Sequence, residues 1–113
     1  MKVYDLQQVQ EMASGDKEFI KEIVKAFLEE LPPDVAQMRE AAENNNPELA
    51  YGFVHKMKPN LQLFGLNLSE NVKNLETWSK EKSNREDILR DVTQIEERVF
   101  LACKALKKDY NIS

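Results

Sequence analysis

The sequence contains few of the residues that tight turns, disulfides and metal sites require. Its 113 residues include 3 glycines and 4 prolines, too few for the many turns of an all-β protein. The single cysteine, Cys103, cannot form an internal disulfide, which is typical of a reducing compartment. One cysteine and one histidine cannot supply a zinc site, and no glutamate precedes the histidine by three residues, as a two-metal helical site requires. We therefore expect neither a zinc site nor a two-metal helical site on this chain.

Long apolar runs and an excess of positive charge are also missing. No apolar run approaches the roughly 20 residues that span a bilayer, and the first residues, MKVYDLQQVQ, lack the apolar core of a signal peptide. Lysine and arginine total 16 against 20 acidic residues, and this net charge of −4 disfavours nucleic-acid binding. We expect a cytoplasmic protein that neither inserts into a membrane nor binds nucleic acid.

What the sequence does have is helix-forming residues in amphipathic order. Hydrophobic residues make up 42% of the chain and recur every three to four positions. This pattern predicts five helices: a short one over 5–13, a long one from 16 to about 43, one over 47–64, one from about 67 through 78, and one over 85–109. Residues 1–113 have the usual size of one domain. Four long helices with short connections predict an all-α fold, an antiparallel up-down four-helix bundle with an additional short N-terminal helix.

Short polar residues and prolines mark the predicted helix ends. Asp16, Asn46 and Ser83 are suited to N-cap positions, and Pro47 follows Asn46 at the first helical position, where its missing N–H costs nothing. The pair Pro32–Pro33 interrupts the second helix, although the apolar stripe continues beyond it. The pattern indicates either one kinked helix or two segments that meet at these prolines.

The only histidine, His55, lies in the third predicted helix, within the stretch AYGFVHKMKPNLQLFG. On a helical wheel it falls opposite the buried side, next to Tyr51, Lys58 and Gln62. This position argues against a core histidine and leaves two interpretations, a solvated surface residue and a nucleophile. Spacing alone favours the first. A neutral imidazole can nevertheless attack phosphorus, and a lysine one turn away can neutralise phosphoryl oxygens.

The stretch HKMKPNLQLFG, residues 55–65, resembles the signature of histidine-containing phosphotransfer (HPt) domains. In that signature a lysine follows the histidine by three residues, and a glycine preceded by a large apolar residue follows by about ten. The resemblance extends over roughly residues 5–80. It implies that His55 accepts a phosphoryl group, that Lys58 stabilises the phosphoryl charge, and that Gly65 allows close packing or a turn.

The resemblance also implies a partner and a surface that binds it. The partner would be the receiver domain of a response regulator or of a hybrid sensor kinase. Mg²⁺ would be bound by the receiver, so this chain would need no cofactor. This chain would be a monomeric shuttle without kinase activity of its own, rather than a conventional enzyme. The partner-binding residues would be Tyr51, Pro59, Gln62, Val9 and Met12.

One position departs from the family pattern. Pro59 stands where the family usually has a glycine, whose missing side chain leaves room for the phosphoryl group. Proline fills part of that space, and it cannot donate a hydrogen bond to the carbonyl of His55. The sequence leaves open whether the proline makes a tolerated kink or tilts His55 outward. It also leaves open a different function, that of a helical adaptor or inhibitor that binds a signalling partner without carrying phosphate.

Overall fold

The computed structural model describes residues 3–81 and 85–112, and within these ranges the chain forms helices and no strands. The helices are α1 (Gln7–Met12), α2 (Lys17–Glu43), α3 (Pro47–Leu63), α4 (Ser69–Glu81) and α5 (Arg85–Asp109). The prediction of an all-helical protein with five helices is confirmed. The observed bounds lie within about three residues of the predicted ones.

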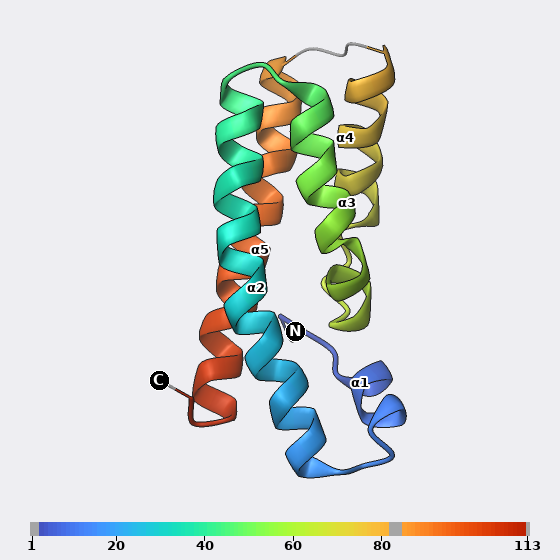
Figure 1. Cartoon of the computed structure of the whole chain (residues 1–113), viewed down its shortest axis with the longest axis vertical. Helices are drawn as coiled ribbons and strands as arrows, with labels where there is room; N and C mark the ends of the chain where they lie inside the picture. Colours follow the sequence, from blue (N-terminus) through green and yellow to red (C-terminus); the bar gives the residue numbers. More distant parts are fainter. Residues whose placement is uncertain (1–2, 82–84, 113) are drawn as a thin grey trace.

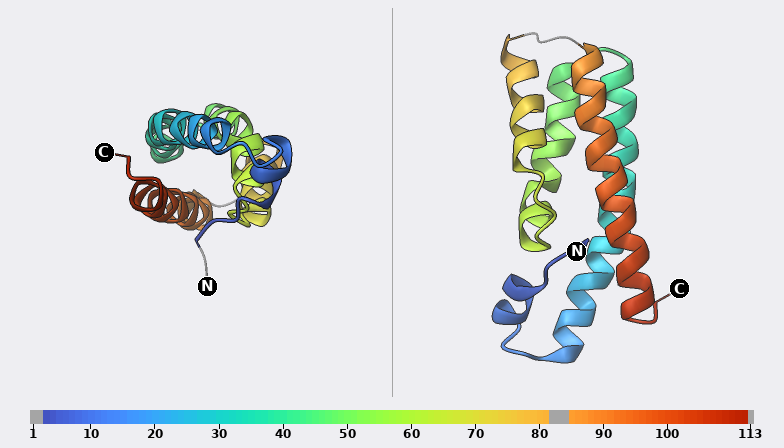
Figure 2. Two further views of the ribbon diagram at one scale, coloured as in Figure 1. Left: turned by 90° about the horizontal axis from the view of Figure 1, so that it is seen from below. Right: turned by 180° about the vertical axis from the view of Figure 1, so that it is seen from behind.

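The four long helices lie side by side, and consecutive helices run in opposite directions (Figure 1). α2 packs against α3 and α5, and α4 packs against the same two helices, so that the four surround a common interior (Figure 2). α1 lies beyond the shared end of α3 and α4, beside the first turns of α2. One long helix, α3, therefore has both α2 and α4 as neighbours.

Local side-chain caps explain where two of the helices begin. The Asp16 carboxylate accepts hydrogen bonds from the backbone N–H groups of Glu18, at 3.0 Å, and Phe19, at 3.3 Å. The Asn46 side chain accepts one from the N–H of Leu49 at 3.2 Å, and Pro47 occupies the first turn of α3. Each such cap stabilises a helix by about 1 kcal/mol. The N-cap predicted at Ser83 lies outside the described residues.

α2 continues through Pro32–Pro33 as one helix of 27 residues. The alternative of two separate segments is therefore wrong. A proline inside a helix costs about 3 kcal/mol because a backbone hydrogen bond is lost. Leu31 and Val35, on either side of the pair, are fully buried. The burial of such side chains, worth roughly 1.5–3 kcal/mol each, offsets the cost of the prolines.

The last helix, α5, faces the interior with an apolar seam. Its residues from Ile88 to Leu106 are buried, at alternating steps of four and three positions: Ile88, Val92, Ile95, Val99, Ala102 and Leu106. Cys103, beside this seam, is also buried. Trp78 of α4 is also buried, at 2% exposed. One face of each long helix is therefore buried in the core, and the opposite face is exposed to solvent.

Candidate functional site

His55 lies on the exposed face of α3, opposite the core. Its neighbours Val54 and Met57 are buried, whereas His55 itself is exposed. Of the residues predicted to share its face, Gln62 is exposed, and Tyr51 and Lys58 are half-buried. The helical wheel therefore placed His55 on the correct side of the helix.

The two flanks of His55 are fixed by contacts to different helices. On one flank, the hydroxyl of Tyr51 donates a hydrogen bond to Glu76 of α4 at 3.1 Å. On the other, the ammonium group of Lys56 pairs with Asp34 of α2 at 3.2 Å. The Asp34 side chain is only 10% exposed, whereas that of Lys56 is 68% exposed, so this ion pair lies at the edge of the contact between α2 and α3.

Lys58, three residues after His55, differs from Lys56 in its contacts. Among the described residues it takes part in no hydrogen bond or ion pair within the distance limits of such contacts. It borders a groove of about 440 Å³ between the end of α3 and the start of α4. Other polar residues along this groove are Gln8, Gln62, Asn67 and Ser69. An ammonium group without an internal partner at the edge of a groove is suited to bind an anion.

α3 remains continuous at Pro59. The surface near His55 has free space at Gly52, on the other side of the histidine from Pro59. Pro59 is exposed, and α3 continues past it to Leu63. Gly52, three residues before His55, is also exposed, and a Cβ added there would meet nothing within 4 Å. Space next to the imidazole therefore exists one turn before the histidine, although Pro59 occupies part of the surface one turn after it.

Gly65, for which close packing or a turn was expected, lies in a turn and against the N-terminal segment. Its φ is +64°, a conformation that favours glycine, and it follows the last turn of α3. A Cβ on Gly65 would lie 2.7 Å from the Cβ of Asp5. The close neighbour is the N-terminal segment, whose Asp5 N–H donates to the carbonyl of Phe64 at 2.8 Å.

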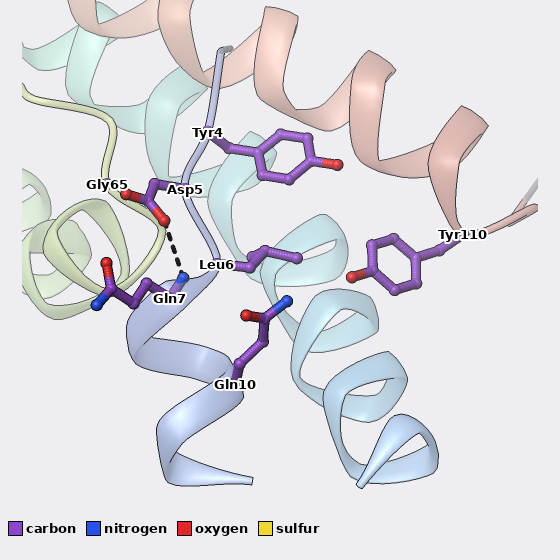
Figure 3. A pocket seen from close by; sticks show the side chains of 7 residues that line it. All are labelled: Tyr4, Asp5, Leu6, Gln7, Gln10, Gly65 and Tyr110. Atoms are coloured by element: carbon purple, nitrogen blue, oxygen red, sulfur yellow. Dashed lines mark hydrogen bonds between the residues drawn. The ribbon is translucent and has the colours of Figure 1, made fainter. Parts of the chain in front are cut away.

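The same N-terminal segment borders a second pocket, of about 500 Å³, at this end of the molecule (Figure 3). Gly65 and the side chains of Leu6 and Gln10 line it, together with Tyr4 and Tyr110 from opposite ends of the chain. The hydroxyl of Tyr4 donates a hydrogen bond to Asp109, the last residue of α5. The segment before α1 is therefore tied to the ends of both α3 and α5.

The structure corrects the assignment of Val9 to the partner-binding surface. Val9 is fully buried, because α1 turns its inner side, which also carries Leu6, toward the core. Met12 is 52% exposed and remains available to a partner. α1 also reaches the candidate site by another residue, Gln8, which borders the groove next to Lys58.

Sequence reasoning did not identify Gly52, Glu76 or Lys80. Lys80 donates a hydrogen bond to Glu76 at 3.1 Å, next to the bond from Tyr51. The spacing of four residues between Glu76 and Lys80 could have suggested an ion pair on α4. Its contact with Tyr51 depends on how α3 and α4 pack, which the spacing does not give.

Within residues 3–81 and 85–112, no cluster of three histidine, cysteine, aspartate or glutamate residues is arranged to hold a metal ion. In the same part of the chain, no helix is both long enough and apolar enough to cross a membrane.

Comparison of the chain with protein-family models, with curated proteins and with solved structures found no match. The relation to HPt domains therefore depends on the motif at residues 55–65 and on what its residues can do chemically.

Proposed function

We propose that this chain is a histidine phosphotransfer protein of a two-component phosphorelay. It would carry a phosphoryl group between the aspartates of receiver domains through His55. The observation that supports this proposal most directly is an exposed imidazole next to a lysine that forms no hydrogen bond or ion pair with residues 3–81 or 85–112. His55 and Lys58 lie one helical turn apart on the face of α3 that the core does not use.

The proposed chemistry needs only these side chains and a phosphorylated partner. A nitrogen lone pair of the His55 imidazole attacks the phosphorus of an aspartyl phosphate. The N–P bond forms as the P–O bond to the aspartate breaks, and the aspartate carboxylate leaves with the electron pair. The ring then releases the proton of its other, non-phosphorylated nitrogen to solvent. Transfer to a second receiver reverses these steps, and Lys58 compensates the charge on the phosphoryl oxygens throughout.

The remaining elements of the proposal concern the assembly. The four long helices would form the antiparallel up-down four-helix bundle of the HPt family, residues 1–113 would be one monomeric domain, and the protein would act in the cytoplasm. The bound Mg²⁺ would belong to the receiver, and this chain would need no cofactor. Tyr51, Pro59, Gln62 and Met12 would border the surface that the receiver covers.

A transfer assay tests the proposed function. The chain is incubated with a panel of phosphorylated receiver domains from the same genome, and its phosphate is then tested for stability. Phosphohistidine is labile in acid and stable in alkali, and we expect such phosphate on this chain. Binding of a receiver without any transfer would favour the alternative, a bundle adaptor or inhibitor, and would overturn the proposal.

Removal of the Lys58 ammonium group should slow transfer more than it weakens binding. We expect Lys58→Ala to reduce the rate constant of transfer about 10- to 100-fold, or about 1.4–2.8 kcal/mol in activation free energy. The Kd for the receiver should change less than about threefold, because an exposed charge adds little to affinity. Rapid-quench kinetics at saturating receiver would measure the rate constant.

The matched control for this variant is Lys104→Ala, which removes an exposed lysine from α5 and changes the net charge equally. It should transfer phosphate at the wild-type rate. Equal losses of binding and transfer in Lys58→Ala would contradict the role assigned to Lys58, as would an equal loss in Lys104→Ala.

A further inference from the structure

Tyr51 connects His55 to α4 through a chain of contacts. The rings of Tyr51 and His55 meet edge to face, with centroids 5.7 Å apart and an interplanar angle of 77°. The Tyr51 hydroxyl donates to one oxygen of Glu76 at 3.1 Å, and the other oxygen accepts from Lys80 at 3.1 Å. The exposed histidine therefore contacts an aromatic ring that is itself held at its far end.

The contact between Tyr51 and His55 is expected from their spacing of four residues on one helix. Helical side chains lean toward the N-terminus and cover the preceding turn. Tyr51 and Gly52 precede His55 by four and three residues, so they lie in the turn toward which the imidazole leans. Gly52 offers it no side chain, whereas Tyr51 offers a half-buried ring. Of the two, Tyr51 alone can restrict how the imidazole turns.

The charges in this network hold the hydrogen bond of Tyr51 in one direction. The hydrogen bond from Lys80, followed by that from Tyr51, lowers the pKa of Glu76 from its ordinary value. Burial, followed by the hydrogen bond to Glu76, raises the pKa of the Tyr51 phenol. Near neutral pH the phenol is therefore a donor and the carboxylate an ionised acceptor.

We propose that Tyr51, anchored by Glu76 and Lys80, is a positioning residue that holds the His55 imidazole in one orientation for phosphoryl transfer. This inference rests on the proposed function. Attack on phosphorus requires the nitrogen lone pair to lie in line with the breaking bond, so a freely rotating imidazole is aligned only part of the time. The anchor is on α4, hence the orientation of the nucleophile depends on how α3 and α4 pack.

The pair formed by Glu76 and Lys80 has a second consequence for the site. After Lys80 and Tyr51, the charge of Lys58 makes the smallest contribution to the lowered pKa of Glu76. Lys80 neutralises Glu76 directly at 3.1 Å. Glu76 can therefore anchor Tyr51 while competing little with a phosphoryl group for Lys58.

The test uses the fact that His55 is the only histidine in the chain, so its ring C–H signals in an NMR spectrum are unambiguous. In the unphosphorylated wild-type protein we expect cross-relaxation between the rings of His55 and Tyr51, and His55 shifts displaced by the aromatic ring current. Tyr51→Phe removes the anchor and retains the ring. It should weaken the cross-relaxation and move the His55 shifts toward those of a free histidine.

The same variant should slow transfer about three- to tenfold at saturating receiver with an unchanged Kd, since alignment and not binding is lost. Glu76→Ala should have the same effects on the spectrum and the rate. Glu76→Gln retains an oxygen that accepts the hydrogen bond from Tyr51, so its His55 spectrum and its transfer rate should stay close to those of the wild type. A residue that only supported the fold would alter the melting temperature without this pattern.

The matched control is Tyr4→Phe, which removes a tyrosine hydroxyl that also donates to a carboxylate, that of Asp109, at the far end of the chain. It should leave the His55 signals and the transfer rate unchanged. Wild-type His55 signals in Tyr51→Phe, or equal changes in Tyr4→Phe, would overturn the positioning role. Failure of the wild-type chain to accept phosphate would instead refute the proposed function, while the NMR comparison would still decide whether Tyr51 orients His55.

Discussion

His55→Gln is expected to accept no phosphate from any receiver that phosphorylates the wild-type chain. Glutamine has a similar size and polarity, but its amide nitrogen has no free lone pair with which to attack phosphorus. Because the His55 side chain is exposed, the free energy of unfolding should change by less than about 0.5 kcal/mol. The measurement is the acid-labile, alkali-stable phosphate on the variant after incubation with phosphorylated receiver.

The chemical stability of any remaining label separates the possible results. Phosphate on a serine, threonine or tyrosine survives acid, so it would not be counted as transfer through histidine. Acid-labile phosphate on His55→Gln at the wild-type level would show that another residue is the acceptor and would refute the proposed function. Circular dichroism of the variant provides the control, because an unchanged helical spectrum excludes loss of fold as the cause.

The sequence predicted helix ends well where local chemistry determines them. Asp16 and Asn46 cap their helices through their own side chains, so their effect can be recognised without knowledge of the packing. Pro32–Pro33 shows the limit of such local rules. The rule against proline inside a helix was outweighed by the burial of the neighbouring side chains Leu31 and Val35, which depends on the other helices.

The same distinction applies to the candidate site. The period of α3 placed His55, Lys58 and Gln62 on one outward face, because a helix fixes these directions by itself. The period of α1 could not show that Val9 is covered, since that depends on where a six-residue helix docks. Likewise, Glu76 became part of the site only through the packing of α4 against α3.

Gly65→Ala, at the end of α3, should lower the stability of the protein more than the other substitutions proposed above. A residue other than glycine at a φ of +64° costs about 1–2 kcal/mol. The new Cβ would also lie 2.7 Å from the Cβ of Asp5, so the N-terminal segment must move. Together these effects should lower the free energy of unfolding by about 2–4 kcal/mol, measured by urea denaturation.

Gly15→Ala separates the two contributions. Gly15 has a φ of +76°, but a Cβ there would meet nothing within 4 Å, so this variant should show only the conformational cost. Asp5→Gly should partly restore stability in the Gly65→Ala background, because it removes the atom nearest to the new methyl group. Since Asp5 also accepts a hydrogen bond from the N–H of Gln7, a double-mutant cycle is needed to isolate the contact. Equal losses in Gly65→Ala and Gly15→Ala, with no coupling between positions 5 and 65, would show that the end of α3 does not depend on the N-terminal segment.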